Sequence, residues 1–276
     1  MNKNERGLRA MKEFGLQLYS IRDYFTTEES TKNAFLEMAK MGYTQAQTAG
    51  LYEYISPEKF KEYADAAGID LFSTHYDYAK IKNDVEETVK YHKTIGAKYV
   101  GVGGVDPANF ASVEAIKAFI AEFNELAAIY AGYGFKLTYH NHSREFCKVD
   151  GKPAYYYLIE GFDKENISFC LDTYWAQYAG IDVCGLIESL NGRVDIIHLK
   201  DMTPWIPFDL ASGGTLYAPR LIEVGEGVMN FKRIIEYAER AGTKYFIVED
   251  EYYTTGNSME SIAISAKNIK ETLLEK

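Results

Sequence analysis

Short apolar runs alternate with longer segments of helical period along the 276 residues of the chain. The runs lie at 14–20, 43–50, 69–77, 98–104, 136–146 (apolar at its start), 167–174, 194–201 and 245–251. Runs this uniformly apolar are typical of parallel strands that are buried on both faces. The pattern therefore predicts a parallel sheet with eight strands.

Segments with helical spacing follow the apolar runs. Thr26 with Glu29 matches a capping box, and Ser56 before Pro57 matches an N-cap with proline at the first helical position. Further helices are expected near 82–95, 116–127, 153–160, 182–191, 229–241 and 257–274. Eight strand–helix units in about 260 residues predict an α/β fold, a (β/α)8 TIM barrel. We expect a single domain over 1–276, with an N-terminal extension at 1–12 and a long irregular loop at 202–228 after the seventh strand.

The composition and net charge of the chain argue against some classes of binding partner. The formal net charge is −10 and the isoelectric point is about 5.1, which argues against nucleic acid because phosphate backbones require a basic surface. The negative net charge does not exclude a small anionic substrate, because such a substrate needs only a few positively charged side chains at its binding site. The three cysteines form no CxxC pair, the N-terminus lacks an apolar signal segment, and no apolar run reaches 18 residues. We expect a cytoplasmic protein with free thiols and no membrane span.

Polar side chains gather where the apolar runs end, which in such a barrel is the rim of the active site. They are Gln17, Gln47, His75, Asp77, His140, Asn141, His142, Glu145, Asp172, His198, Lys200, Asp201, Glu249, Asp250 and Glu251. Singly, His75 is explained as a rim histidine with its hydrogen bonds satisfied, and Asp172 as a helix cap. Together, the order Glu or His, Asp, His, Glu over the fifth to eighth strands indicates a divalent cation: Mn²⁺, Co²⁺, Mg²⁺ or Zn²⁺.

Six motifs in chain order give the sequence a family resemblance. They are "GLQLYSIRD", "YHNHSREF", "ISFCLDTYW", "IIHLKDM", "VGEGVMNF" and "FIVEDE". With them the chain resembles the sugar phosphate isomerase/epimerase-like family, the xylose isomerase-like TIM barrels. The resemblance implies a metal site made of Glu145, Asp172, His198 and Glu249, with Glu251 as an alternate for Glu249. It is compatible with a homo-oligomer.

The chain departs from the family pattern at three positions. Many members have a glutamate where this chain has His140, so the fifth-strand ligand is open between His140 and Glu145, and Glu145 is preferred. Many members have a glutamate in place of Gln47 and a histidine in place of Trp175. The histidine-rich "YHNH" site is more similar to the dehydratase and 3-keto-eliminating members.

The resemblance leads to a hypothesis of metal-dependent proton abstraction next to a carbonyl of a sugar, keto-sugar or cyclitol, by an isomerase or epimerase. His142 is the expected base, with Glu145 and Glu249 as alternates, and Lys200 is expected to neutralise an oxyanion or bind phosphate. The expected substrate-binding residues are Gln17, His75, His140, Asn141 and Trp175. The alternative is a lyase similar to inosose dehydratase or to enzymes that eliminate aglycones from 3-keto-glycosides. A non-catalytic sugar-binding or partner subunit is a third hypothesis, and the net charge argues against cleavage of abasic DNA.

Overall fold

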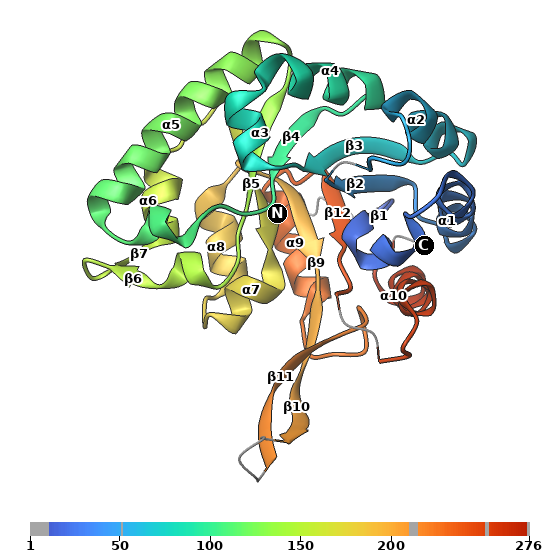
Figure 1. Ribbon diagram of the computed structural model, residues 1–276. Helices are drawn as coiled ribbons and strands as arrows, with labels where there is room; N and C mark the ends of the chain where they lie inside the picture. Colours follow the sequence, from blue (N-terminus) through green and yellow to red (C-terminus); the bar gives the residue numbers. More distant parts are fainter. Residues whose placement is uncertain (1–10, 51, 210–214, 252–253, 275–276) are drawn as a thin grey trace, which may run out of the picture.

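The apolar runs form the parallel strands of a closed barrel that helices surround (Figure 1). The computed structural model describes residues 11–50, 52–209, 215–251 and 254–274, without the side chains of 205–218. In these residues the barrel order is β1-β12-β9-β8-β5-β4-β3-β2. The barrel strands are β1 (Gly15–Gln17), β2 (Gln45–Ala49), β3 (Asp70–His75), β4 (Tyr99–Val102), β5 (Lys136–His140), β8 (Ile167–Asp172), β9 (Val194–Leu199) and β12 (Tyr245–Val248). The predicted single-domain TIM barrel is confirmed.

The surrounding helices mostly follow the predicted spacing, and α7 (Thr173–Tyr178) is a short helix that was not predicted. They are α1 (Glu28–Met41), α2 (Pro57–Ala66), α3 (Tyr78–Asn83), α4 (Val85–Ile95), α5 (Val113–Gly132), α6 (Ala154–Gly161), α7 (Thr173–Tyr178), α8 (Val183–Leu190), α9 (Phe231–Arg240) and α10 (Ser258–Thr272), with 3-10 turns η1 (Leu18–Tyr24), η2 (Pro107–Phe110) and η3 (Arg144–Phe146). The capping box of α1 is formed by Thr27 and Ser30, so the predicted box at Thr26 was one residue early. The helix predicted over 82–95 is interrupted at Asp84.

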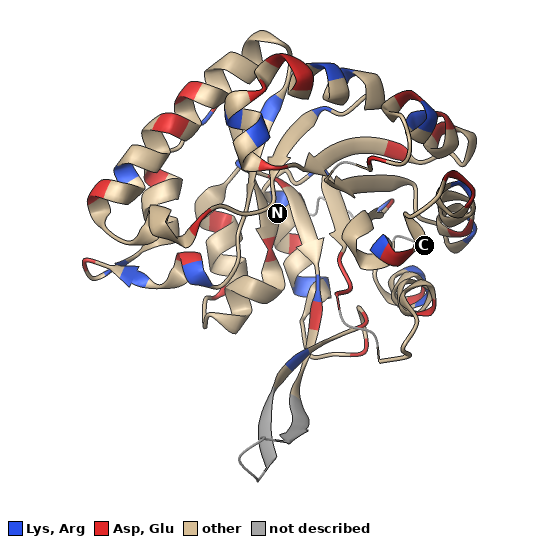
Figure 2. Ribbon diagram, viewed as in Figure 1, with Lys and Arg blue, Asp and Glu red and all other residues tan. Residues whose placement is uncertain are grey.

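Charged residues lie mainly on the outer helices, where both signs are interspersed (Figure 2). The barrel strands carry few of them, as expected for strands buried on both faces. No helix in the described part of the chain is both long and apolar enough to cross a membrane.

The interior of the barrel is apolar below the carboxyl ends of the strands. A cluster separate from the main core joins side chains of non-adjacent strands, which places it inside the barrel: Phe72, Tyr99, Cys170, Ile196 and Ile247. Successive residues of a strand face opposite sides, so residues two positions apart share a face. Asp172, His198 and Glu249 therefore follow this cluster on the inner face, toward the carboxyl ends of the strands.

The segment 202–228 is not irregular as predicted. It contains the antiparallel hairpin of β10 (Asp201–Asp209) and β11 (Thr215–Ile222), which projects away from the barrel (Figure 1). Residues 210–214 lie outside the described residues. The Asp201 carboxylate fastens the base of the hairpin by accepting the backbone N–H groups of Met202, Gly225, Gly227 and Met229.

The first and last described residues of the chain, Met11 and Leu274, lie side by side. Of the extension predicted at 1–12, residues 1–10 lie outside the described residues, while Met11 is buried and forms a bridge with Leu274. A second small hairpin joins β6 (Lys148–Val149) to β7 (Lys152–Pro153).

A buried histidine between β3 and α4 makes stability depend on pH. The hydroxyl of Thr74 lies 2.8 Å from Nε2 of His92, and Nδ1 of His92 lies 2.7 Å from the carbonyl oxygen of Thr88. Burial lowers the pKa of His92 to about 4, although the bond to Thr88 opposes the shift. The unfolded chain, where the histidine pKa is about 6.5, therefore binds the extra proton first as the pH falls.

We expect the free energy of unfolding to fall by about 3 kcal/mol between pH 6.5 and pH 4 because of His92 alone. The His92→Gln variant is less stable at pH 7, but its unfolding free energy should vary less over this interval. Urea unfolding at half-unit pH steps measures the difference, which corresponds to roughly one proton. Parallel pH profiles in the two proteins would contradict the assignment.

Candidate metal centre

Four buried side chains at the carboxyl ends of adjacent strands bring their ligand atoms together. Each of His140, Asp172, His198 and Glu249 offers one atom, and these atoms lie within 4.8 Å of one another. They come from the ends of β5 and β8, from β9, and from the residue after β12, which are neighbours in the barrel. The cluster thus lies directly above the apolar interior.

The distances leave several of these atoms unpaired. Nδ1 of His198 lies 2.8 Å from Oε2 of Glu249, whereas Nε2 of His140 lies 3.5 Å from Oδ2 of Asp172 and 3.9 Å from Oε2 of Glu249. Within the described residues, both ring nitrogens of His140 and Oδ2 of Asp172 have no hydrogen-bond partner. Buried polar atoms are normally satisfied, so two imidazoles and two carboxylates arranged in this way fit a divalent cation.

Hydrogen bonds to Oδ1 and to the backbone of Asp172 hold this residue in place. Its Oδ1 accepts the backbone N–H of Trp175 at 2.9 Å and caps α7. The side chain of Asn141 accepts the Asp172 N–H at 3.0 Å and donates to its carbonyl at 3.2 Å. These bonds leave Oδ2 facing the cluster. Asn141, which is predicted to bind substrate, joins the ends of β5 and β8 through these bonds.

Lys200 supplies positive charge beside the cluster. Its Nζ lies 2.7 Å from Oε1 of Glu251, 3.4 Å from Oε2 of Glu249 and 3.7 Å from Oδ2 of Asp172. Burial alone would raise the pKa of Asp172 and Glu249, but the Lys200 ammonium and the neighbouring His140 and His198 together outweigh it and hold both below their usual range. The three carboxylates in turn raise the pKa of Lys200 despite its burial. Both carboxylates of the cluster are therefore ionised and able to bind a cation.

Glu145, the preferred fifth-strand ligand, lies outside this cluster. Its carboxylate accepts the Tyr139 hydroxyl and the His142 backbone N–H, each at 2.9 Å. Tyr139 packs against Phe119 of the outer layer, so the neighbouring His140 faces into the barrel. His140 occupies the fifth-strand position of the cluster. Glu251, the predicted alternate, pairs with Lys200 instead.

A cavity of about 770 Å³ opens beside the cluster. Its lining includes Tyr19, His75, His140, His142, Glu249 and Glu251. The His75 ring lies 4.7 Å from that of His140, and a Cβ at Gly103 would come within 2.9 Å of the His75 ring. Burial and the nearby His140 lower the pKa of His142 to about 3, so its imidazole is neutral near pH 7. The cavity therefore presents an unprotonated imidazole to a bound molecule.

Two other predicted substrate residues have partners within the chain. Gln17 is fully buried and bonds to the backbone of Tyr19 and to Gln47. Trp175 is half-buried, with its ring 5.3 Å from Nζ of Lys200 and 5.8 Å from the ring of His142.

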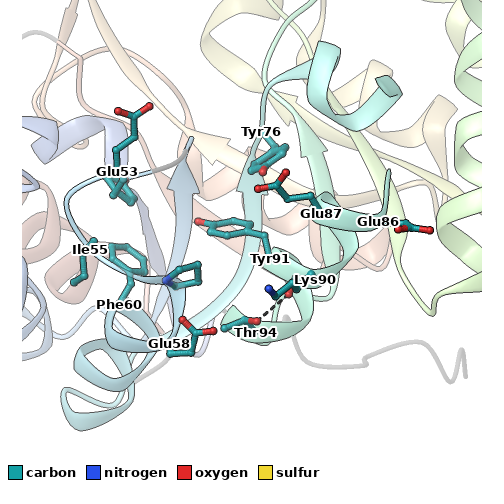
Figure 3. Close-up of a pocket in the computed structure, with 12 residues that line it drawn as sticks. Glu53, Ile55, Glu58, Phe60, Tyr76, Glu86, Glu87, Lys90, Tyr91 and Thr94 are labelled. Atoms are coloured by element: carbon teal, nitrogen blue, oxygen red, sulfur yellow. Dashed lines mark hydrogen bonds between the residues drawn. The ribbon is translucent and has the colours of Figure 1, made fainter. Parts of the chain in front are cut away.

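A second cavity, of about 820 Å³, lies between α2 and α4 on the outside of the barrel (Figure 3). Phe60 and Tyr91 form part of its wall, and the carboxylates of Glu53, Glu58 and Glu87 are exposed around it. None of the four cluster residues lines it. It is therefore distinct from the metal-ligand cluster, although Tyr76 lines both cavities.

The family model of the xylose isomerase-like TIM barrels matches residues 35–272. The chain belongs to this family. The resemblance carried by the strand-end motifs is thereby confirmed. No match was found among curated proteins.

Solved structures with the same fold include proteins described as enzymes of different reaction types. A sugar phosphate isomerase/epimerase from Parabacteroides distasonis has a TM-score of 0.79 and 22% identity, over 98% of this chain and 96% of that one. A probable 3-DHS dehydratase, AsbF, from Bacillus anthracis has a TM-score of 0.72 and 13% identity, over 94% and 98%. The IOLI protein, with a bound zinc atom, has a TM-score of 0.66 and 16% identity, over 94% and 97%. At these identities the likeness shows the shared barrel alone.

Proposed function

We propose that this xylose isomerase-like barrel is a divalent-metal-dependent isomerase or epimerase that removes the proton next to a carbonyl of a sugar, keto-sugar or cyclitol. The observation that carries the proposal is the buried set of His140, Asp172, His198 and Glu249, with unpaired ligand atoms beside an open cavity. A sugar-binding subunit has no need for buried, ionised carboxylates and imidazoles that face one another. The family membership and the zinc in the IOLI neighbour support the same assignment.

In this proposal His140 takes the ligand position that the family resemblance assigned to Glu145. Two imidazoles and two carboxylates favour Zn²⁺, Co²⁺ or Mn²⁺ over Mg²⁺, which prefers a shell of oxygen atoms. A bound cation would supply Lewis-acid stabilisation of the oxyanion that develops on the substrate.

The other residues have roles that follow from their positions. His142 lines the cavity with a neutral imidazole and would accept the proton from the carbon next to the carbonyl. Lys200, paired with Glu251, acts with the neighbouring histidines to keep the two metal-binding carboxylates in their ionised form. His75 lies at the cavity wall, where it would contact a substrate hydroxyl.

The direct test combines metal analysis with proton exchange. Purified protein should contain or take up about one equivalent of Zn, Co or Mn per chain. In D₂O, ketoses, 3-keto sugars and inososes are then screened by NMR for deuterium incorporation next to the carbonyl. Deuterated isomer or epimer supports the proposal, whereas loss of water or of a β-substituent assigns the lyase alternative. Protein that binds no divalent cation after reloading would overturn the metal-dependent function.

A further inference from the structure

His198 has a second buried partner beneath the metal cluster. Its Nε2 lies 2.8 Å from Oε1 of Gln47, on the opposite side of the ring from Nδ1 and Glu249. Gln47 is fully buried on β2, across the barrel from β9. Gln47 stands at a position where many members of the family have a glutamate.

The direction of this hydrogen bond follows from a backbone donor. The N–H of Tyr19 can only donate, and it bonds to Oε1 of Gln17 at 3.1 Å. The other end of the Gln17 amide, Nε2, therefore donates to Oε1 of Gln47 at 2.8 Å. Nε2 of Gln47 donates in turn to the hydroxyl of Ser73 at 3.2 Å. The Gln47 oxygen is thus fixed toward His198 as an acceptor.

An acceptor at this position determines which nitrogen of His198 carries hydrogen. The oxygen of Gln47 cannot donate, so Nε2 of His198 holds the proton of their bond. The lone pair available to a cation is then on Nδ1, the atom that faces Glu249 and Asp172.

We propose that Gln47 is a positioning residue, which holds the Nε2 proton and the ring plane of His198 so that Nδ1 is presented to the metal. The inference rests on the proposed metal site and adds the residues that prepare it. Gln17 and Ser73 act through Gln47 by fixing the orientation of its amide. Partners of this kind on metal-binding histidines typically contribute 10–100-fold to metal affinity.

The chain offers matched variants for a test. Gln47→Met keeps the length of the side chain but removes the strong acceptor, so Zn²⁺ affinity, measured by chelator competition, should fall about 10–100-fold. Gln47→Glu retains an acceptor oxygen and should bind Zn²⁺ at least as tightly as the wild type. Gln45→Met alters a buried glutamine two residues earlier on β2 and should leave the affinity within about threefold of the wild type.

Zinc affinity unchanged in Gln47→Met, or reduced equally in Gln47→Met and Gln45→Met, would overturn the inference while leaving the metal site in place. A wild-type protein that binds no divalent cation would overturn both. If Gln47→Met does not fold, the ¹⁵N spectrum of the zinc-loaded wild type decides. A protonated Nε2 and a zinc-bound Nδ1 on His198 support the assignment, and the reverse pattern overturns it.

Discussion

Replacing Asp172 with asparagine should empty the metal site and lower turnover by at least about 10³-fold, since metal-bound stabilisation of the oxyanion contributes several kcal/mol. Oδ2 of Asp172 faces the cluster without a hydrogen-bond partner among the described residues. With the amide oxygen retained by the Trp175 N–H, asparagine places an NH₂ group, which cannot bind a cation, at this position. Oδ1 can still accept the N–H of Trp175, so the cap of α7 is preserved. The substitution therefore separates the metal ligand from the helix cap.

A matched control is available on the loop before β8. Oδ1 of Asp163 accepts the backbone N–H groups of Glu165 and Asn166, as a capping aspartate does. Asp163 belongs to neither of the two candidate metal clusters among the described residues. Asp163→Asn should leave metal content and turnover unchanged. Elemental analysis and deuterium exchange are measured on both variants. If Asp172→Asn keeps its metal and its turnover, the cluster is an ion-pair network and not a catalytic centre.

The barrel was predictable because its strands are buried on both faces, which leaves continuous apolar runs in the sequence. The hairpin β10–β11 was not predicted, because Pro204, Pro207 and Pro219 argue against strands. A hairpin that stands apart from the barrel consists of two edge strands, where proline is tolerated. The cap of α1 was placed one residue early because Thr26 and Thr27 carry the same side chain, and only the backbone direction distinguishes them.

The candidate site was predictable where a residue lies inside a strand and less so where it lies beyond one. Strand alternation places Asp172 and His198 on the inner face, and both were expected there. Glu145 follows the end of β5 by five residues, and the turn η3 carries it back to the Tyr139 hydroxyl on the outer side. The role of Gln47 depends on a contact across the barrel, between residues that are 151 positions apart. No local pattern in the sequence shows such a contact.

Replacing His142 with alanine should slow proton exchange by about 10²–10⁴-fold while the metal content stays at the wild-type level, because a positioned general base contributes on that scale. His142 lines the cavity, but it is not one of the four clustered ligands. Its backbone N–H, which anchors Glu145, is retained in the variant. The loss should therefore be confined to the proton transfer.

Added imidazole distinguishes a base from a residue that only shapes the cavity. The space left by the His142 ring opens to the 770 Å³ cavity, so free imidazole can enter and should restore part of the exchange in His142→Ala. Rescue that rises with imidazole concentration identifies the side chain as the proton acceptor, because packing alone gains nothing from a diffusing base. Unchanged exchange in His142→Ala would instead assign the base to a carboxylate, Glu249 or Glu251, both of which face the same cavity. Wild-type protein with imidazole is the control, and its rate should not change.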